Sequence, residues 1–451
     1  MSTPPPPTPA PDSPPPGGWL ADRLLRRLLA NAGKLLGGKT ANALFGLAAL
    51  AIAARALGLE TFGVLVLIHT FTQAVGEIAK FQSWQAVLRY GTPALQTGAH
   101  GDFRRLLRFT VLLDGISAAA GMVLAVMLAW WLAPRFGWPA EVVPAAMLYV
   151  TSVLFMVTAT PTGVLRLIDR FDILATQSAI APFIRMAGGA VVWALGGGIG
   201  WFLVAWYLGT ALAGIHLIGE GWRQLHRRGL LTGWRWRGGG MTAGFTGIWR
   251  FVWTTNLNTT LELAFTHIGT LAVGWVLGPQ AAALFRVGRQ FADALAKPAK
   301  LLVPAIYPEL ARLAAGADYG AMRRLALRSA LLAGGLGTAT LGIVWLGGEL
   351  LLRLTVGPEF VAAYPVMLWL VAGAVIGIWA FPLEPLLIST GHPGTALAVR
   401  LVTTVIYLPL LFWLLGSIGL IGGGIAFLAA SLLILGGMLG PVVLYFRRRR
   451  T

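Results

Sequence analysis

The stretch that decides the fold runs from Leu277 to Leu310 and reads LGPQAAALFRVGRQFADALAKPAKLLVPAIYPEL. It is apolar enough to cross a membrane, yet within the apolar part it carries Arg286, Arg289, Asp293, Lys297 and Lys300. At about 100° per residue, these five positions share one face of a helix. At a rise of ~1.5 Å per residue, the charged face extends over roughly 21 Å, most of a hydrocarbon core about 30 Å thick.

This charged face predicts a watery cavity lined by protein. A lone charge near the centre of a bilayer costs about 2.5–3.5 kcal/mol even on the most lenient scale, so a lipid-facing surface is excluded. The surplus of cations predicts an anionic substrate, because arginine suits bidentate contacts with phosphate. The alternative is a structural ion-pair network between helices, in which carboxylates neutralise the cations, namely Asp293, Glu262 and Glu77.

The composition is that of an integral membrane protein. The chain is 57% hydrophobic and 12% charged, whereas a soluble domain averages about 25% charged residues. The absence of cysteine excludes disulfides and thiolate metal sites, and the six histidines form no HExxH-like cluster, so no cofactor is expected. The net charge of +18 comes mostly from arginines in short loops between apolar runs, a pattern of membrane proteins and not of nucleic-acid binding.

The first 36 residues precede the membrane region. Residues 1–18 are rich in proline and lack an apolar block, which predicts a disordered tail and not a signal peptide. Residues 19–36 mix leucine with arginine, which predicts a basic amphipathic helix on the membrane surface. The segment from Gly33 to Thr40 matches the phosphate-binding pattern G-x-x-x-x-G-K-T. That pattern needs a preceding strand, so we interpret the match as chance.

The apolar segments predict an all-α integral membrane protein with about 12 transmembrane helices, at residues 38–57, 62–84, 109–132, 142–162, 173–195, 199–219, 245–276, 280–304, 327–348, 362–383, 395–415 and 421–445. Most arginines fall in loops on the side of both termini, which predicts cytoplasmic termini by the positive-inside rule. The expected domains are a tail with an amphipathic helix at 1–36, an N-lobe of six spans at 37–222, a basic cytoplasmic linker at 223–244, a C-lobe of six spans at 245–446 and an arginine tail at 447–451.

The two halves repeat at an offset of about 220 residues. Leu57-Gly58 matches Leu277-Gly278, and Gly137 matches Gly357. At this offset the charged face falls on a second polar face, formed by His69, Gln73, Glu77 and Lys80. Two homologous six-helix lobes, related by an axis along the membrane normal, are therefore expected to enclose one central cationic cavity.

Neighbouring spans add polar residues to this cavity, namely Lys39 in the first span and Asn258, Glu262 and His267 in the seventh. Some of the candidates could bind a coupling proton or sodium ion or could serve as charge partners, and both readings stay open for Asp293, Glu262, Glu77 and His267. Asp114 and Arg185, in the third and fifth spans, are expected to form a structural pair or to reach toward the membrane surface.

Three short motifs resemble those of bacterial polysaccharide-lipid flippases: Ala54-Arg55-Ala-Leu-Gly58-x-x-x-Phe62-Gly63, Leu165-Arg166-x-x-Asp169-Arg170-Phe171 and Pro385-Leu-Leu-Ile-Ser-Thr-Gly391. These are the O-antigen-type lipid-linked oligosaccharide flippases of the multidrug/oligosaccharidyl-lipid/polysaccharide exporter superfamily, and the resemblance covers residues 37–446. It implies a V-shaped pair of six-helix bundles that works by alternating access. The family's acid in the seventh span is replaced here by Thr266-His267, with Glu262 one turn earlier.

The resemblance also implies a function. The protein would move undecaprenyl-pyrophosphate-linked oligosaccharide across the bacterial inner membrane for surface polysaccharide and lipopolysaccharide biosynthesis, with glycan polymerase or assembly proteins as partners. The lipid tail would stay in the bilayer between the lobes. Cations would hold the pyrophosphate and sugar in the cavity, namely Arg286, Arg289, Lys297, Lys300 and Lys80.

Three other functions are alternatives to the flipping of lipid-linked oligosaccharide. A lipid II flippase is the nearest, because it also carries an anionic lipid pyrophosphate. A multidrug/cation antiporter shares the fold, but a cationic substrate would favour carboxylates in the cavity. A membrane polymerase or ligase would need a large outer loop with catalytic Arg or His, whereas the outer segments here are short. The chain is therefore expected to be a transporter and not an enzyme.

Overall fold

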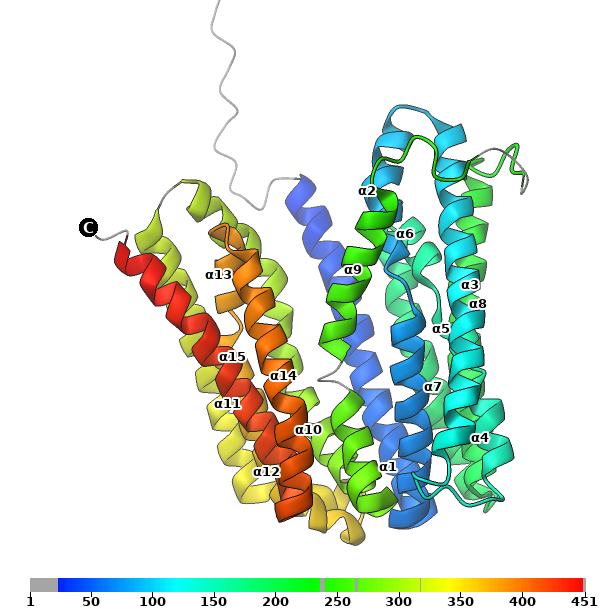
Figure 1. Cartoon of the computed structure of the whole chain (residues 1–451), viewed down its shortest axis with the longest axis vertical. Coiled ribbons are helices and arrows are strands. Elements are labelled where there is room, and N and C mark those ends of the chain that lie inside the picture. Colours follow the sequence, from blue (N-terminus) through cyan, green and yellow to red (C-terminus); the bar gives the residue numbers. More distant parts are fainter. Residues whose placement is uncertain (1–22, 236–239, 264–266, 317, 449–451) are drawn as a thin grey trace, which may run out of the picture.

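The computed structural model describes residues 23–235, 240–263, 267–316 and 318–448, which form helices and no strands. The first half of the chain folds into one lobe (Figure 1). Its elements are α1 Arg23–Ala79, α2 Ser83–Gln96, α3 His100–Leu132, α4 Val143–Val150, α5 Val153–Met156, α6 Ala159–Leu167, α7 Phe171–Ala194 and α8 Ile199–Arg227. Helix α1 contains two spans, because Gly58 breaks it with φ 70° and ψ 174°, a conformation that favours glycine.

The second half begins with α9, and its helices from α10 onward form the other lobe (Figure 1). Its elements are α9 Ile248–Leu263, α10 Gly269–Ala315, α11 Tyr319–Thr355, η3 Pro358–Ala363, α12 Tyr364–Ala380, α13 Leu383–Ser389, α14 Pro393–Ile418 and α15 Leu420–Arg448. Gly278 breaks α10 with φ 85° and ψ −177°, as Gly58 breaks α1. Gly137 and Gly357 also both have positive φ. The backbone thus repeats at the predicted offset, and the predicted two-lobed, all-α integral membrane protein is confirmed.

The molecule has the shape of a V (Figure 1). The first and last described helices, α1 and α15, begin and end at the same end of the molecule, where the two lobes diverge. We call this the proximal end, and the opposite end, where the lobes meet, the distal end. Nine segments of the described chain are long and apolar enough to cross a membrane, and the first of them, Gly37–Gln96, contains the two spans separated by Gly58.

Polar contacts join the lobes at the distal end. The Arg55 side chain donates from Nε to the Thr355 carbonyl oxygen at 2.9 Å. The backbone N–H of Leu59 donates to the Glu359 carboxylate at 3.2 Å. Arg55 thereby binds a free carbonyl at the end of α11, and Glu359 binds a backbone N–H just after the break in α1.

Apolar contacts complete this junction. The Phe62 and Phe360 rings meet edge to face, with their centroids 5.6 Å apart. Gly63 lies so close to the backbone of Pro279 that a Cβ atom would have no room. We call these polar and apolar pairs together the distal contact. The first of the three motifs, from Ala54 to Gly63, therefore forms part of the junction between the lobes.

Helix α9 follows the linker in sequence but packs on the first lobe. The rings of Phe81 and Trp253 lie 5.2 Å apart, and those of Phe109 and Trp249 lie 5.1 Å apart. Val252 is fully buried in the same cluster. The prediction of one continuous span over 245–276 stays a prediction, because residues 264–266, which follow the end of α9 at Leu263, lie outside the described residues.

Two other predicted spans are interrupted. The helix expected over 62–84 stops at Ala79 and resumes as α2, and the helix expected over 142–162 is split into α4, α5 and α6. Asp114 contacts the chain at both interruptions. Its carboxylate accepts hydrogen bonds from Ser83 Oγ at 2.5 Å and from Thr160 N at 2.7 Å. Ser83 and Thr160 lie in the first turns of α2 and α6, so a single buried carboxylate binds the beginnings of two helices, through a side chain in α2 and through a backbone N–H in α6.

Replacing Asp114 with alanine should destabilise the protein. The Ser83 hydroxyl and the Thr160 N–H would each lose a buried partner, at a cost of about 1–3 kcal/mol apiece. We expect a clearly lower melting temperature of the purified protein in detergent. Thr92→Ala is the control, because that hydroxyl bonds only to Leu88 O of its own helix. An unchanged melting temperature of the Asp114 variant would mean that other groups satisfy both donors.

The basic helix expected over 19–36 is not a separate surface helix in the described chain. From Arg23 onward it is continuous with the first span, as the start of α1, because no proline or positive-φ residue interrupts the chain before Gly58. Gly38 packs against α7, where a Cβ atom would lie 2.5 Å from the Ala175 carbonyl oxygen. The P-loop-like segment lies inside this helix and forms no loop, as expected.

Candidate functional site

The charged face of α10 and the polar face of α1 lie at the same depth in the two lobes. Gly58 precedes His69 by as many residues as Gly278 precedes Arg289. At ~1.5 Å per residue, both side chains lie roughly 16 Å from the break in their helix, near the middle of a bilayer. The repeat therefore places the two predicted faces at the same depth.

On the first lobe, His69 belongs to a buried polar network. Its Nδ1 lies 2.7 Å from the Tyr149 hydroxyl, and its Nε2 lies 3.4 Å from Arg185 Nη1. Arginine can only donate, so Nε2 accepts, and the proton on Nδ1 is donated to Tyr149. The second Nη of Arg185 donates to Thr210 Oγ1 at 3.0 Å, and the Trp206 ring lies 5.5 Å from the guanidinium. The network fixes the guanidinium of Arg185.

On the second lobe, Arg289 and Arg286 have different surroundings. Arg289 donates from Nε to the Asp293 carboxylate at 3.2 Å and lies 4.1 Å above the Phe427 ring. Arg286 is half-buried and has no hydrogen bond or ion pair to another described side chain. His267 lies two residues before the first residue of α10 and interacts electrostatically with Arg286 and Arg289.

The two sides form one group across the interface between the lobes. The charges of Arg185 and Arg286 interact, although the residues come from α7 and α10. His69 interacts with both of these arginines and with His267. Among the described side chains of this group, Asp293 supplies the carboxylate. We call the group the mid-depth cluster, made of His69, Arg185, His267, Arg286, Arg289 and Asp293.

The remaining candidates from the sequence lie elsewhere or outside the described part. Gln73 and Glu77 are half-buried on α1, further toward the proximal end than His69. Lys80 follows the end of α1, where its charge interacts with Asp114, and Lys39 is exposed on α1. The structure does not bring these four side chains into the mid-depth cluster. Four other candidate side chains lie outside the described residues, namely Asn258, Glu262, Lys297 and Lys300.

Arg185 is the residue of the cluster whose place the sequence did not reveal. The expected structural pair with Asp114 is wrong, because Asp114 binds Ser83 and Thr160 while Arg185 binds His69 and Thr210. The sequence does contain a signal for Arg185, since a lone arginine within an apolar span indicates a protein-lined cavity, as the arginines of α10 do. Tyr149 and Thr210 carry no such signal.

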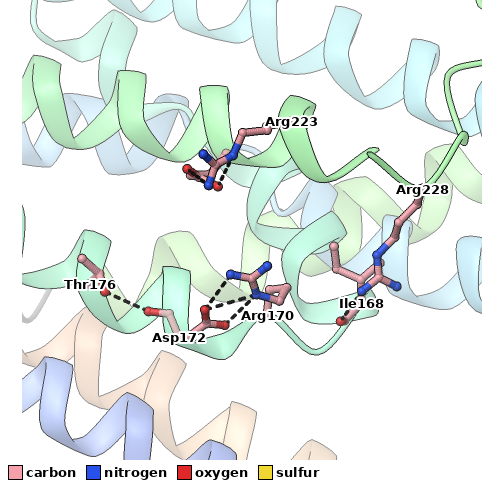
Figure 2. Close-up of polar contacts among 7 residues, drawn as sticks. Ile168, Arg170, Asp172, Thr176, Arg223 and Arg228 are labelled. Carbon is pink, nitrogen blue, oxygen red and sulfur yellow. Dashed lines mark hydrogen bonds and ion pairs between the residues drawn. The ribbon is translucent and has the colours of Figure 1, made fainter. Parts of the chain in front are cut away.

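The second motif, after the fourth span, forms a turn at the proximal end (Figure 2). Asp169 has a positive φ of 58°, which ends α6, and Arg228 donates to the Ile168 carbonyl at 3.4 Å. Hydrogen bonds from Arg170 lower the pKa of the Asp172 carboxyl. Since this pKa is lower in the folded state, the ion pair stabilises the fold above the unfolded pKa, and that contribution is lost as the pH falls. Both side chains are partly exposed, so the contribution is small.

No model of a known protein family matches this chain. Over 348 residues the chain is 35% identical to the inner membrane protein YghQ of Escherichia coli (strain K12), a match that covers 77% of this chain and 97% of that protein.

Solved structures share the fold. The inward closed conformation of the lipid II flippase MurJ superposes with a TM-score of 0.72 at 11% identity, covering 90% of this chain and 87% of MurJ. The inward-facing conformation of a multidrug resistance MATE family transporter of the MOP superfamily gives a TM-score of 0.71 at 12% identity, covering 92% and 96%. At these identities the likeness establishes only the fold, which is that of the MOP superfamily. The two lobes described above belong to this fold.

Proposed function

This chain belongs to the family of the inner membrane protein YghQ, and from that premise we propose that it is a flippase of the bacterial inner membrane. Its substrate is an oligosaccharide linked to undecaprenyl pyrophosphate, moved from the cytoplasmic to the outer leaflet. The product enters surface polysaccharide biosynthesis, such as that of lipopolysaccharide. Both termini lie in the cytoplasm, so the proximal end faces the cytoplasm.

The mid-depth cluster carries this proposal. Its three arginines come from both lobes and converge at the depth where charges are most costly, with the Asp293 carboxylate in ion-pair contact with Arg289. A site of this polarity favours an anion, and the pyrophosphate of a lipid carrier offers oxygen atoms that guanidinium groups bind in pairs. Arg286 is the best placed to bind it, since it makes no hydrogen bond or close ion pair with another described side chain, and only the charge of Asp293 attracts it.

The same geometry suggests how binding promotes alternating access. Arg185 and Arg286 belong to opposite lobes, and their like charges interact unfavourably. A pyrophosphate between them would replace this repulsion by two attractions and draw the lobes together at mid-depth. Closure around the substrate would then compete with the distal contact, whose opening releases the substrate to the outer leaflet. The ligand shifts the equilibrium only because it binds the two states differently.

The energy source belongs to the same proposal. Asp293 is held by Arg289, which favours a role as charge partner over ion binding. Glu77 and His267 are the described candidates for a proton or sodium site. Flipping in vesicles that carry a pH gradient or a sodium gradient distinguishes these two ions from transport without coupling.

A lipid II flippase is the second candidate, because MurJ shares the fold and lipid II also presents a pyrophosphate to such a cluster. The deciding experiment reconstitutes the protein in liposomes and offers lipid-linked oligosaccharide, lipid II and a cationic dye in parallel. We expect the oligosaccharide lipid to be flipped and the dye to be retained. Flipping of lipid II alone would favour the second candidate. Dye transport without lipid flipping would contradict both and indicate a cation antiporter.

A further inference from the structure

The second lobe contains a cleft that the proposed function does not use. It encloses about 630 Å³ between α11, α12, α13 and α15, at the proximal end. Its lining is apolar apart from two arginines, and includes Leu327, Ala330, Trp379 and Leu439. Leu327 is 54% exposed and Leu439 is 44% exposed, so the cleft opens toward the surroundings of the lobe, which are lipid in a membrane.

The two arginines mark the rim of the cleft. Arg323 lies in the second turn of α11 and Arg447 in the last turn of α15, both at the proximal end of their helices. Both are exposed, and neither has an ion pair or hydrogen bond to another described side chain. At this depth the phosphate groups of lipids surround a membrane protein, so the rim complements a negative head group.

In the first lobe the corresponding groove is filled by the chain itself. The repeat pairs Arg323 with Arg104, which lies against the linker at Gly233. One turn further along α3, Arg108 donates from Nη1 to the Arg235 carbonyl oxygen at 2.8 Å. Leu230 is buried in the adjoining apolar cluster. The linker thus covers in the first lobe the surface that stays open in the second.

The sequence of α15 differs from that of α8 beside this cleft. In α8, Gly221 lies close to α6, where a Cβ atom would lie 2.7 Å from that of Pro161. Aligning the starts of α8 and α15 puts Val442 at the position of Gly221 and Leu435 at that of Gly214. Both larger side chains line the cleft.

We propose that this cleft binds one anionic phospholipid, with an acyl chain between α11 and α15 and the phosphate between Arg323 and Arg447. A methylene group is about as large as a water molecule, which occupies ~30 Å³, so the cleft has room for roughly 20 such groups. An apolar lining alone would accept any lipid tail, whereas the two unpaired arginines select a negative head group. The site is separate from the mid-depth cluster and does not depend on which substrate is flipped.

The test is lipid binding by native mass spectrometry on the purified protein in detergent, titrated with phosphatidylglycerol and with phosphatidylcholine. Each arginine near an anionic lipid surface contributes about 1 kcal/mol, so we expect wild type to prefer phosphatidylglycerol by about tenfold or more. Arg323→Gln/Arg447→Gln should abolish the preference. The matched control is Arg324→Gln/Arg328→Gln, which removes two exposed arginines of α11 outside the cleft and should keep it.

A second variant tests the apolar part and guards against misfolding. Ala330→Phe fills the cleft while both rim arginines remain, and should weaken phosphatidylglycerol binding without lowering the melting temperature. Equal binding of both lipids by wild type, equal losses in the two double variants, or full binding by Ala330→Phe would each overturn the proposal. Tighter binding of undecaprenyl phosphate than of phosphatidylglycerol would also overturn it, and would assign the cleft to the carrier lipid.

Discussion

Flipping of the lipid-linked oligosaccharide should fall by at least about a hundredfold when Arg286 and Arg289 are both replaced with glutamine, because removing one partner of a buried, hydrogen-bonded charge pair costs about 2–5 kcal/mol. Arg286 is available to the substrate, since no described side chain binds it. Arg289 adds a second guanidinium, oriented by Asp293 and Phe427. Glutamine keeps hydrogen-bond donors at both positions and removes only the charges.

The measurement is the initial rate of flipping in proteoliposomes with matched protein content. Arg312→Gln is the control, because Arg312 is an exposed arginine of the same helix that pairs with Glu309. It should flip at the rate of wild type. A well-folded double variant with a rate near that of wild type would show that the mid-depth cluster only holds the lobes together.

Bridging Arg55→Cys to Thr355→Cys with a short, reducible bis-methanethiosulfonate should stop flipping, and reduction should restore it. The Arg55 side chain already reaches the Thr355 carbonyl oxygen, so the linker would fix the distal contact as it stands. The proposed alternating access requires this contact to open, since the substrate would leave on that side. We expect the bridged protein to flip no faster than empty vesicles.

The native chain has no cysteine, so the reagent modifies only the introduced thiols. The two single-cysteine variants, treated with the same reagent, control for modification without bridging, and the untreated double variant gives the reference rate. Undiminished flipping by fully bridged protein would contradict the assignment of the distal contact as a gate. It would leave the role of the mid-depth cluster untouched.

The two-lobed fold could be predicted because its signals are local. Apolar length marks the spans, and Gly58 and Gly278 mark equivalent breaks that recur in the backbone as matching positive φ angles. The pairing of His69 with Arg289 follows from the same offset. The charges of α10 stood out because charge within an apolar segment needs no tertiary information to be noticed.

The features that sequence missed depend on residues far apart in the chain. Asp114 binds Ser83 and Thr160 where two predicted spans are interrupted, and no periodicity in either span records a carboxylate on a third helix. Likewise, the packing of α9 on the first lobe depends on rings such as Phe81 and Phe109, which lie in the other half of the chain. Arg185 joined the cluster through tertiary contacts with His69 and Thr210.

Because of the position of α9, the two halves resemble the subunits of an obligate heterodimer more than two independent domains joined by a linker. Ile248 and Val252 are buried against α2 and α3, so the second half supplies part of the first lobe's surface. Divided at the linker, the chain would yield two polypeptides that carry complementary apolar faces for each other. Neither half would then fold with all of its apolar surface covered, so we expect the two pieces to be stable only as a complex with each other.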